Sequence, residues 1–587
     1  MKWRWLVHIR ICAMLGLCLL SFDACTRQGK TTPMPTLTPT LPPTLSSATA
    51  SPTTQPVPTA TQPMPTATPT VPPQPSPTPP AGPVLCIGWV GVPQTLNPMA
   101  EQPSKADTVL ALIYDRLVYR ALDNSYTPAL ATNWSSPDGG KTWVFSLQPN
   151  IKAHDGQLLD SEDVAFSLNL VQNHYKFRYT AGYTLTMQVQ ATSSHSLTIT
   201  LSQPAGNIEA LVHWIPLMPK RVYESGAFDA GKHIGSGPFI LQDFQPGQAI
   251  TLTANPNYWG GAPRVGAVVF RNYASVEDLA AALKNGQVDV ITDLPPSLIA
   301  ALKSDAHIQV VTGPQIHFHE LLFNVSTRAQ STGHPALKDK QVRLAIAYAI
   351  DKQQLIDVAL VGRGMPGLSI IPPVLGKWFN AAVTDVPFDP DKAKQILESA
   401  GYKDTSGDGI REMPGGSKSL NLRLFISSDS ATGNQEANMI VNWLRQIGIE
   451  ATFTKLDPAA MSAATCPACN FDLMLWERDG GPDPGFLLST LTTAQIESGL
   501  NRTGYSNPTY DALYAQQANT VDQDQRRLIV QQMQQMAFDE RPCIVLYYDL
   551  AVQAFRKDRF RNWLFVPNGA LSLLDVRSLL QVEPVPQ

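Results

Sequence analysis

The segment from residue 31 to residue 83 constrains the fold most, because it cannot contribute to a hydrophobic core. It holds 18 of the 50 prolines, abundant Thr, Ser and Ala, and no charged or aromatic residue. Such a segment cannot bury enough apolar surface to offset the entropy lost on ordering. We expect residues 25–83 to form a disordered, extended Pro/Thr-rich tether. The folded part of the protein is therefore expected in residues 84–587.

The N-terminus has the features of an export signal. A basic start is followed by an apolar stretch from Ile11 to Phe22, and Cys25 comes shortly afterwards. The apolar stretch is too short for a membrane-spanning helix. We interpret residues 1–24 as a lipoprotein signal peptide and Cys25 as the lipidated anchor. Asp23 departs from the usual pattern, so cleavage to a free soluble product is the alternative.

Size and charge narrow the class of protein. The part after the tether is too long for one hydrophobic core, since single cores stop growing near ~250–300 residues. The formal net charge is -4 and no basic cluster occurs, so nucleic acid is not an expected partner. Export would place the remaining cysteines in a compartment where disulfides persist. These are Cys86, Cys466, Cys469 and Cys543.

The periodicity of apolar residues predicts a mixed α/β protein. Strands are expected at Val84–Val90, Thr142–Leu147, Ser196–Leu201, Ala249–Ala254 and Pro542–Tyr548. Helices are expected at Lys105–Arg120, after a capping Ser161, and at Val276–Asn285, Asp391–Ala400, Gln435–Gly448 and Arg526–Phe538.

Seven short phrases follow one another in the first part of the folded region. They are Pro93–Pro98, Pro137–Trp143, His154–Gly156, Ser161–Leu168, Gly235–Pro238, Asn255–Trp259 and Gln341–Asp351. In order, spacing and identity they resemble the family 5 extracellular solute-binding proteins of ABC importers, the oligopeptide, dipeptide and nickel binding group. The resemblance implies a two-lobed, hinged, periplasmic-binding-protein-like α/β fold of type II with an extra subdomain.

Carried onto this chain, the resemblance predicts the domain boundaries. Lobe I would comprise residues 84–122, 213–316 and 542–587, with an extra subdomain at 123–212, and lobe II would comprise residues 317–541. The chain would then cross between the lobes twice, near Ile316–Asn324 and Arg541–Tyr548. Two such strands allow the lobes to close on a ligand by bending.

The resemblance also places a ligand site around Trp476. In oligopeptide and dipeptide members, an aspartate three residues after a tryptophan pairs with the peptide ammonium group, and Asp479 matches that position. A carboxylate in a closed cleft gives a charge-assisted hydrogen bond. Glu477 and Asp483 are the alternative carboxylates. Asp479 could instead simply begin the turn at Gly480–Pro482.

One departure argues against free dipeptides. Dipeptide binders hold the ligand carboxylate with an Arg and a Tyr, whereas the corresponding stretch here, Ser427–Asn434, has no cation. Longer peptides or another amine-bearing solute are therefore expected. The substrate class stays open, because the family also includes binders of nickel chelates and sugars.

Three motifs resemble metal or redox sites without completing them. His317–His319 is not part of HExxH, because Phe323 stands where the second His belongs, so no metal is expected there. Asp404–Gly409 resembles a calcium loop, but Gly415 occupies the position of the bidentate Glu, which favours a turn. Cys466–Cys469 lacks a second CxxC, which favours a local disulfide.

These observations lead to the receptor of an ABC importer, without enzymatic activity or a cofactor. We expect a monomer that captures peptides and delivers them to a permease and ATPase complex, anchored to the outer face of the membrane or held in the periplasm. A sensory or nutrient lipoprotein for a non-peptide solute, such as a metal chelate or sugar, is the alternative. A secreted hydrolase would need a catalytic constellation, and none is visible in the sequence.

Overall fold

The computed structural model describes residues 82–98, 104–174, 186–228, 231–292, 294–416, 418–565 and 575–586. They all belong to one compact unit, Ser76–Gln587. The predicted signal peptide, Cys25 and the tether lie outside the described residues. Among the described residues, no helix combines the length and the apolar character needed to cross a bilayer.

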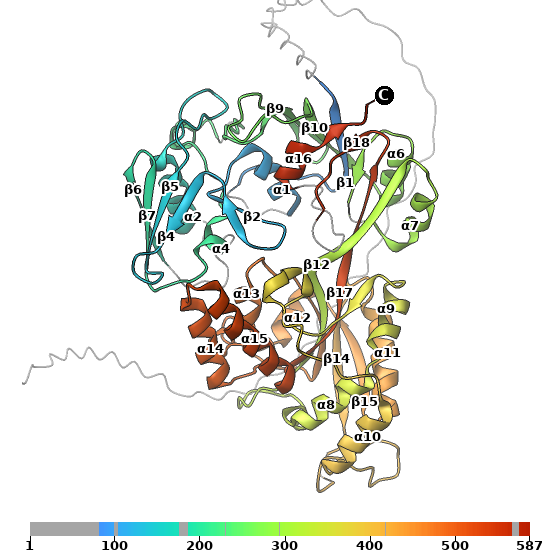
Figure 1. Ribbon diagram of the computed structural model, residues 1–587. Helices are drawn as coiled ribbons and strands as arrows, with labels where there is room; N and C mark the ends of the chain where they lie inside the picture. The colour runs from blue at the N-terminus through green and yellow to red at the C-terminus, as the bar shows by residue number, and fades with distance from the viewer. Residues whose placement is uncertain are drawn as a thin grey trace, which may run out of the picture. The chain divides into compact units, whose positions relative to one another are not determined.

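An 11-stranded mixed sheet runs through the described part of the chain (Figure 1). Its order is β15-β14-β16-β12-β17-β11-β1-β10-β9-β8, and β13 pairs with β17. The strands are β1 (Val84–Val90), β8 (Phe239–Gln245), β9 (Ala249–Ala254), β10 (Ala267–Tyr273), β11 (Val290–Ile291), β12 (Ile308–Phe323), β13 (Gly364–Pro366), β14 (Asn421–Ser427), β15 (Glu450–Leu456), β16 (Leu473–Arg478) and β17 (Cys543–Arg556).

Helices cover this sheet in two bodies, one around β1 and one around β14. The β1 body has α1 (Ser104–Ile113), α6 (Val276–Lys284), α7 (Pro296–Lys303) and α16 (Val576–Gln581). The β14 body has α8 (Lys340–Ala349), α9 (Lys352–Ala359), α10 (Pro390–Ser399), α11 (Gly433–Gln446), α12 (Pro458–Ala464), α13 (Pro484–Ser489), α14 (Pro508–Asn519), α15 (Gln523–Glu540) and the 3-10 helices η1 (Pro335–Lys338), η2 (Pro373–Trp378) and η3 (Thr493–Gln495). Each body has its own core, built around Ile87 and Phe270 in the first and around Leu424 and Ile440 in the second.

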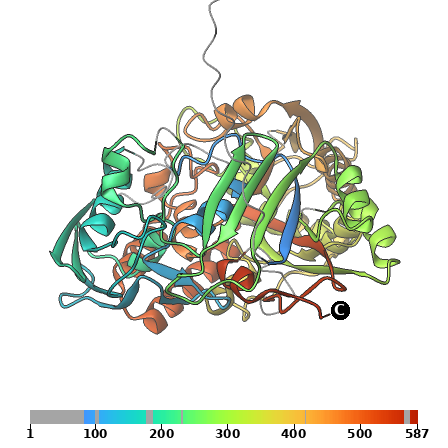
Figure 2. The same cartoon turned by 90° about the horizontal axis from the view of Figure 1, so that it is seen from above.

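A smaller sheet shares the core of the β1 body and lies to one side of β8–β10 (Figure 2). Its order is β4-β5-β7-β6. The elements of this region are β2 (Val118–Arg120), β3 (Tyr126–Pro128), β4 (Ala131–Ser135), β5 (Thr142–Leu147), α2 (Ser161–His174), β6 (Met187–Ser193), β7 (Ser196–Leu201), α4 (Ile208–Val212) and α5 (Lys220–Glu224), and β18 (Phe560–Arg561) pairs with β19 (Glu583–Pro584) near the C-terminus.

The strands β12 and β17 run from one body into the other (Figure 1). They pair antiparallel in two runs, one ending at Pro314↔Leu550 and the next starting at Phe318↔Tyr548, with a register shift between them. An irregularity in a ladder bends the strand and interrupts its hydrogen bonds. The interruption falls where the two bodies meet.

The strands predicted at Val84–Val90, Thr142–Leu147, Ser196–Leu201 and Ala249–Ala254 are confirmed with the same bounds. The helix predicted at Lys105–Arg120 is wrong in its second half, because α1 ends at Ile113 and residues Val118–Arg120 form β2. The predicted cap of α2 is also wrong. Asp160 accepts the backbone N–H of Glu162 at 2.9 Å, whereas the Ser161 hydroxyl donates to the Ser193 carbonyl.

The early end of α1 has a physical cause in Asp115, which is 1% exposed. Its carboxylate accepts hydrogen bonds from the Tyr119 and Tyr258 hydroxyls, at 3.1 and 3.0 Å, and from the Ser236 hydroxyl and Trp259 indole, at 2.8 and 2.9 Å. Burial raises the pKa of Asp115 to about 6, against the effect of these hydrogen bonds. Two phrases of the sequence, Gly235–Pro238 and Asn255–Trp259, thus meet at one buried carboxylate.

Candidate functional site

A pocket of about 390 Å³ opens beside the carboxyl ends of β14 and β16. These parallel strands pair only at Leu424↔Leu473 and Phe425↔Met474, and β16 then continues alongside β12. The crevice at the carboxyl ends of parallel strands is the usual ligand position in open α/β sheets. The pocket is lined by His319, Ile426, Ser427, Asp429, Ser430, Gly433, Glu436, Pro458, Met461, Ser462, Leu475, Trp476 and Glu477.

One wall of the pocket is aromatic. The Arg502 guanidinium lies 4.0 Å from the centroid of the Trp476 ring, a cation–π contact that holds the indole in place. Burial, with a smaller contribution from Arg478, lowers the pKa of Arg502 to about 10. Trp476 also packs against the small cluster that contains Met461, so the pocket has a fixed apolar side.

The pocket also has an acidic side. Asp429, Glu436 and Glu477 line it, and none of the lining residues, all within the described part of the chain, is a lysine or an arginine. Glu477 is 45% exposed and accepts a hydrogen bond from the Ser430 hydroxyl at 2.8 Å. A solute with a cationic group is therefore favoured over one with an anionic group.

Two histidines join this acidic side. His319 has Nδ1 3.4 Å from Glu436 Oε1 and Nε2 4.0 Å from Glu477 Oε1. His317 binds Asp549 through Nδ1, and its Nε2 lies 3.9 Å from Glu477 Oε2. We call these five side chains the histidine–carboxylate cluster. They come from β12, α11, β16 and β17, which the folded sheet brings together.

The neighbouring carboxylates raise the pKa values of these two histidines. Burial opposes protonation of His317, but the hydrogen bond and charge of Asp549, followed by the charges of Asp479 and Glu477, raise its pKa. Burial likewise opposes protonation of His319, but Glu436 outweighs it and raises the pKa of His319. Burial raises the pKa of Glu436, but its pairing with His319 outweighs that effect and lowers it.

The structure separates the four residues predicted from the sequence. Trp476 and Glu477 line the pocket, whereas Asp479 is exposed in the loop after β16 and does not line it. Asp483 is buried, caps α13 by accepting from Gly485, and receives two hydrogen bonds from Arg526 at 2.6 and 2.8 Å. Its carboxylate is therefore committed to holding α13 and α15 together.

Sequence reasoning missed most of the acidic side. Glu436 has the pattern of an exposed helix position, and nothing near it in the sequence indicates a histidine neighbour. Asp429 lies in the loop that was noted only for lacking a cation. His317 and His319 lie two residues apart on β12, but their partner Asp549 is 232 residues away from His317.

The remaining motifs have structural roles. Glu320, which follows His319, is buried and accepts from Arg478 Nε at 2.7 Å. Asp404 accepts from the backbone of Gly407 and Gly409, at 2.7 and 2.9 Å, which confirms a turn. The predicted disulfide between Cys466 and Cys469 is confirmed.

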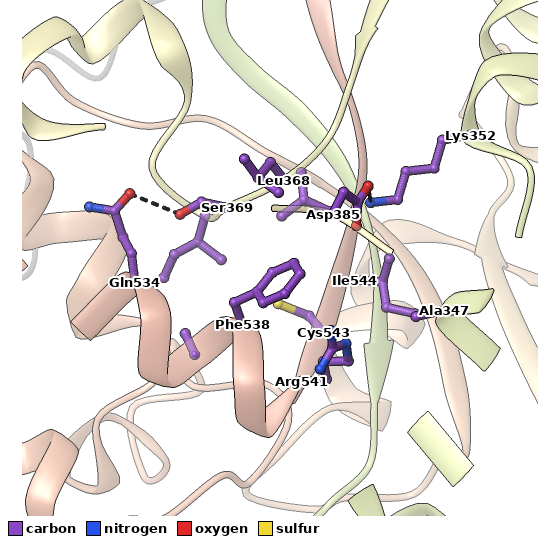
Figure 3. A pocket seen from close by; sticks show the side chains of 13 residues that line it. Ala347, Lys352, Leu368, Ser369, Asp385, Gln534, Phe538, Arg541, Cys543 and Ile544 are labelled. Atoms are coloured by element: carbon purple, nitrogen blue, oxygen red, sulfur yellow. Dashed lines mark hydrogen bonds and ion pairs between the residues drawn. The ribbon is translucent and has the colours of Figure 1, made fainter. Parts of the chain in front are cut away.

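Other cavities lie elsewhere in the described part of the protein. The cavity in Figure 3, about 30 Å³, lies between an ion pair of Lys352 with Asp385 and a hydrogen bond of Ser369 with Gln534. It has room for water and not for a solute. Two grooves, of about 500 and 590 Å³, lie around Trp214 and around α14, away from the carboxyl ends of β14 and β16.

Known proteins resemble this chain over most of its length. A family model described as "Bacterial extracellular solute-binding proteins, family 5 Middle" matches residues 125–498. The oligopeptide-binding protein AppA of Bacillus subtilis is 25% identical over 486 residues, which cover 80% of this chain and 87% of AppA. The nickel-binding periplasmic protein of Escherichia coli is 26% identical over 482 residues, covering 80% and 90%. The crystal structure of the ABC transporter substrate binding protein CtaP from Listeria monocytogenes matches with a TM-score of 0.72 at 24% identity, over 86% of this chain and 100% of CtaP.

Proposed function

Because the chain belongs to the bacterial extracellular solute-binding proteins of family 5 and is the substrate-binding protein of an ABC importer, we propose that it captures peptides and delivers them to a membrane permease. It is a binding protein and not an enzyme. Relatives named for binding oligopeptides and nickel have about the same sequence identity to this chain, so sequence identity does not distinguish between these ligands. The choice rests on the pocket.

The observation that carries the proposal is the acidic, partly aromatic pocket beside Trp476. Its carboxylates suit the ammonium group of a peptide N-terminus, and its apolar wall suits a side chain. We assign the main ammonium contact to Glu477, which lines the pocket. Asp479, placed just beyond the pocket, is the second carboxylate of this proposal.

The backbone of β16 supports a peptide over a compact solute. On the β14 side the described ladder of β16 ends at Met474, so Leu475–Glu477 offer a strand edge along the pocket. A peptide can add to such an edge through its own main chain, which reads any sequence. Side-chain selectivity then comes from the pocket wall.

Closure is proposed to occur about β12 and β17. We assign residues 84–122, 213–316 and 542–587 to lobe I, 123–212 to its extra subdomain and 317–541 to lobe II. The interrupted ladder between Pro314 and Phe318 is the natural place for bending. Gly206 would join the extra subdomain to lobe II in the closed form, because its N–H donates to the Ala518 carbonyl at 2.8 Å.

The proposal includes export and anchoring through Cys25. A lipid on Cys25 would hold the protein at the outer face of the membrane, with residues 25–83 as a spacer. Cys25→Ala should release the protein to the medium or leave its signal uncleaved. Retention in detergent-extracted membranes with the mass of the wild type would contradict lipidation.

Ligand identification tests the function directly. The protein is purified without denaturation, its solute is released by acid, and the extract is analysed by mass spectrometry. We expect peptides, and we expect none in the extract of protein that was first unfolded, dialysed and refolded. Recovery of a sugar or a metal chelate as the sole solute would replace the peptide proposal with that ligand.

A further inference from the structure

The histidine–carboxylate cluster has the arrangement of a metal site. The Nε2 atoms of His317 and His319 lie 3.9 and 4.0 Å from the two oxygens of Glu477, and His319 Nε2 also lies 3.7 Å from Asp549 Oδ2. One ligand atom from each of these three residues lies within 4.8 Å of the others. Ligand atoms around a tetrahedral ion with bonds of ~2.0–2.1 Å stand roughly 3.4 Å apart. The largest of these separations would have to shorten by no more than about 1.4 Å to reach that spacing.

The other nitrogen of each imidazole is already held by a carboxylate. His317 Nδ1 donates to Asp549, and His319 Nδ1 lies beside Glu436. Histidines that bind metals generally donate their second ring N–H to a carboxylate or carbonyl, which fixes the ring and its tautomer. The His319 ring is further fixed by stacking on Tyr547, with ring centroids 4.5 Å apart. Asp549 and Glu436 therefore act as positioning residues for two Nε2 ligands.

We propose that His317, His319 and Glu477 bind a divalent late transition metal ion, of which Zn²⁺ is the representative. Two imidazoles and one carboxylate suit Zn²⁺, Ni²⁺ or Cu²⁺, whereas Mg²⁺ and Ca²⁺ require mostly oxygen ligands. Three protein ligands leave a coordination position free. Since His319 and Glu477 line the pocket, that position faces the space where a solute would bind.

The proposal has two parts that can fail separately. Metal binding depends only on the protein's own side chains. That a captured solute supplies the fourth ligand, through an amine or carboxylate, rests on the proposed function. In that case the solute's amine would bind the ion in place of its ammonium contact with Glu477, and the ion would allow a ligand carboxylate to bind where no lysine or arginine lines the pocket.

A second cluster of acidic side chains is a poorer candidate for a metal site. Asp404, Asp408 and Glu412 also lie close together. However, both oxygens of Asp404 accept backbone N–H groups, and Glu412 accepts the N–H and hydroxyl of Thr405 at 2.7 and 2.9 Å. These oxygens hold a turn, and no imidazole joins them.

Calorimetric titration with Zn²⁺ alone tests the metal site. The exported protein is first dialysed against a chelator and then titrated without any added solute. We expect one tight site in the wild type. His317→Gln and Glu477→Gln should weaken binding by more than about a hundredfold, and Asp549→Asn by about 10–100-fold, the range for positioning residues of metal ligands.

His307→Gln is the matched control, since His307 directly precedes β12, is 63% exposed and does not line the pocket. It should bind Zn²⁺ like the wild type, and all variants should keep the wild-type unfolding temperature. Absence of Zn²⁺ binding in the wild type would overturn the site, as would equal binding in every variant. The ligand-field spectrum of bound Co²⁺ should indicate nitrogen and oxygen ligands, and a thiolate charge-transfer band would instead assign the ion to Cys86 or Cys543.

The solute is tested separately by mass spectrometry of protein purified with and without chelator. Loss of the co-purified solute with chelator supports coordination of the solute by the ion. Retention of the solute, together with normal Zn²⁺ binding, would overturn that coordination and leave both the metal site and the proposed capture of solute intact.

Discussion

The Asp115 network and the histidine–carboxylate cluster are both groups of polar side chains that the fold brings together, but they differ in how completely their hydrogen bonds are satisfied. Asp115 is buried and accepts from four donors, all within the β1 body. The cluster contains five ionisable groups, and Glu477 at its centre is 45% exposed beside a pocket.

The two groups therefore have different roles: the Asp115 network stabilises the fold, whereas the histidine–carboxylate cluster lies where a ligand could bind. A buried polar network whose members are all paired fixes one arrangement of the chain. The Asp115 network does this by joining the turn after α1 to Gly235–Pro238 and Asn255–Trp259, and a side chain at Gly235 would collide with the Ile113 carbonyl at 2.0 Å. The cluster keeps a half-exposed carboxylate, Glu477, at a pocket that His319 also lines, which is what a ligand requires.

The largest effect is expected from Asp115→Ala. Removing the carboxylate takes the acceptor from four donors, of which the Ser236 and Tyr258 side chains are buried and the other two are half-buried, and each unsatisfied buried donor costs about 1–3 kcal/mol. The Tyr119 and Tyr258 hydroxyls, 3.0 Å apart, can still bond to each other. Partial relaxation lowers the sum, so we expect the free energy of unfolding to fall by at least about 3 kcal/mol. Urea denaturation followed by fluorescence measures it. Asp123→Ala, at an exposed position nearby, is the control, and an equal loss in both variants would show that the network is not structural.

The next effect concerns the pocket and should leave the fold unchanged. Glu477→Gln removes a charge that faces the solute, so affinity for the co-purified solute should fall by about tenfold or more. Asp479→Asn should cost less, because Asp479 is exposed and outside the pocket. Calorimetry with the identified solute measures both.

Glu497→Gln is the matched control for this comparison, since Glu497 is 72% exposed and pairs with Arg328. A larger loss for Asp479→Asn than for Glu477→Gln would return the ammonium contact to Asp479. Unchanged affinity in both variants would remove the ammonium contact from this side of the pocket.

Local patterns in the sequence predicted the regular elements well where the pattern and the tertiary contacts agree. The alternation in Thr142–Leu147 and Ala249–Ala254 gives strands with those bounds. The helical spacing after Lys105 continues through Arg120, yet the chain leaves the helix at Ile113 to bring Asp115 to donors more than 100 residues away. A local pattern carries no information about such distant partners.

The site was predictable only in part, for the same reason. The phrase around Trp476 located one strand of the pocket, and Trp476 and Glu477 line it. Glu436 and Asp549 were not identified, because their roles arise from pairing across β12, β17 and α11. Asp483 is an alternative carboxylate in the sequence, but its burial against Arg526 becomes visible only in the fold.

The smallest effect is a pH dependence that belongs to the Asp115 network alone. Burial raises the pKa of folded Asp115 to about 6 from an ordinary value of 3.8, so the folded state holds this proton more tightly than the unfolded chain does. The resulting stabilisation is fully present below the ordinary pKa and is lost as the pH rises through about 6.

Lowering the pH from about 7 to about 5 should therefore stabilise the wild type by about 1 kcal/mol relative to Asp115→Asn, which cannot take up the proton. Other carboxylates titrate in both proteins, so the difference between their unfolding free energies isolates Asp115. Asp123→Asn is the control, because the hydrogen bonds of Ser125 lower the pKa of Asp123, and its difference from the wild type should not grow in the same direction. A wild-type advantage over Asp115→Asn that stays constant between these two pH values would show that Asp115 keeps its charge in the folded protein, held by its four donors alone.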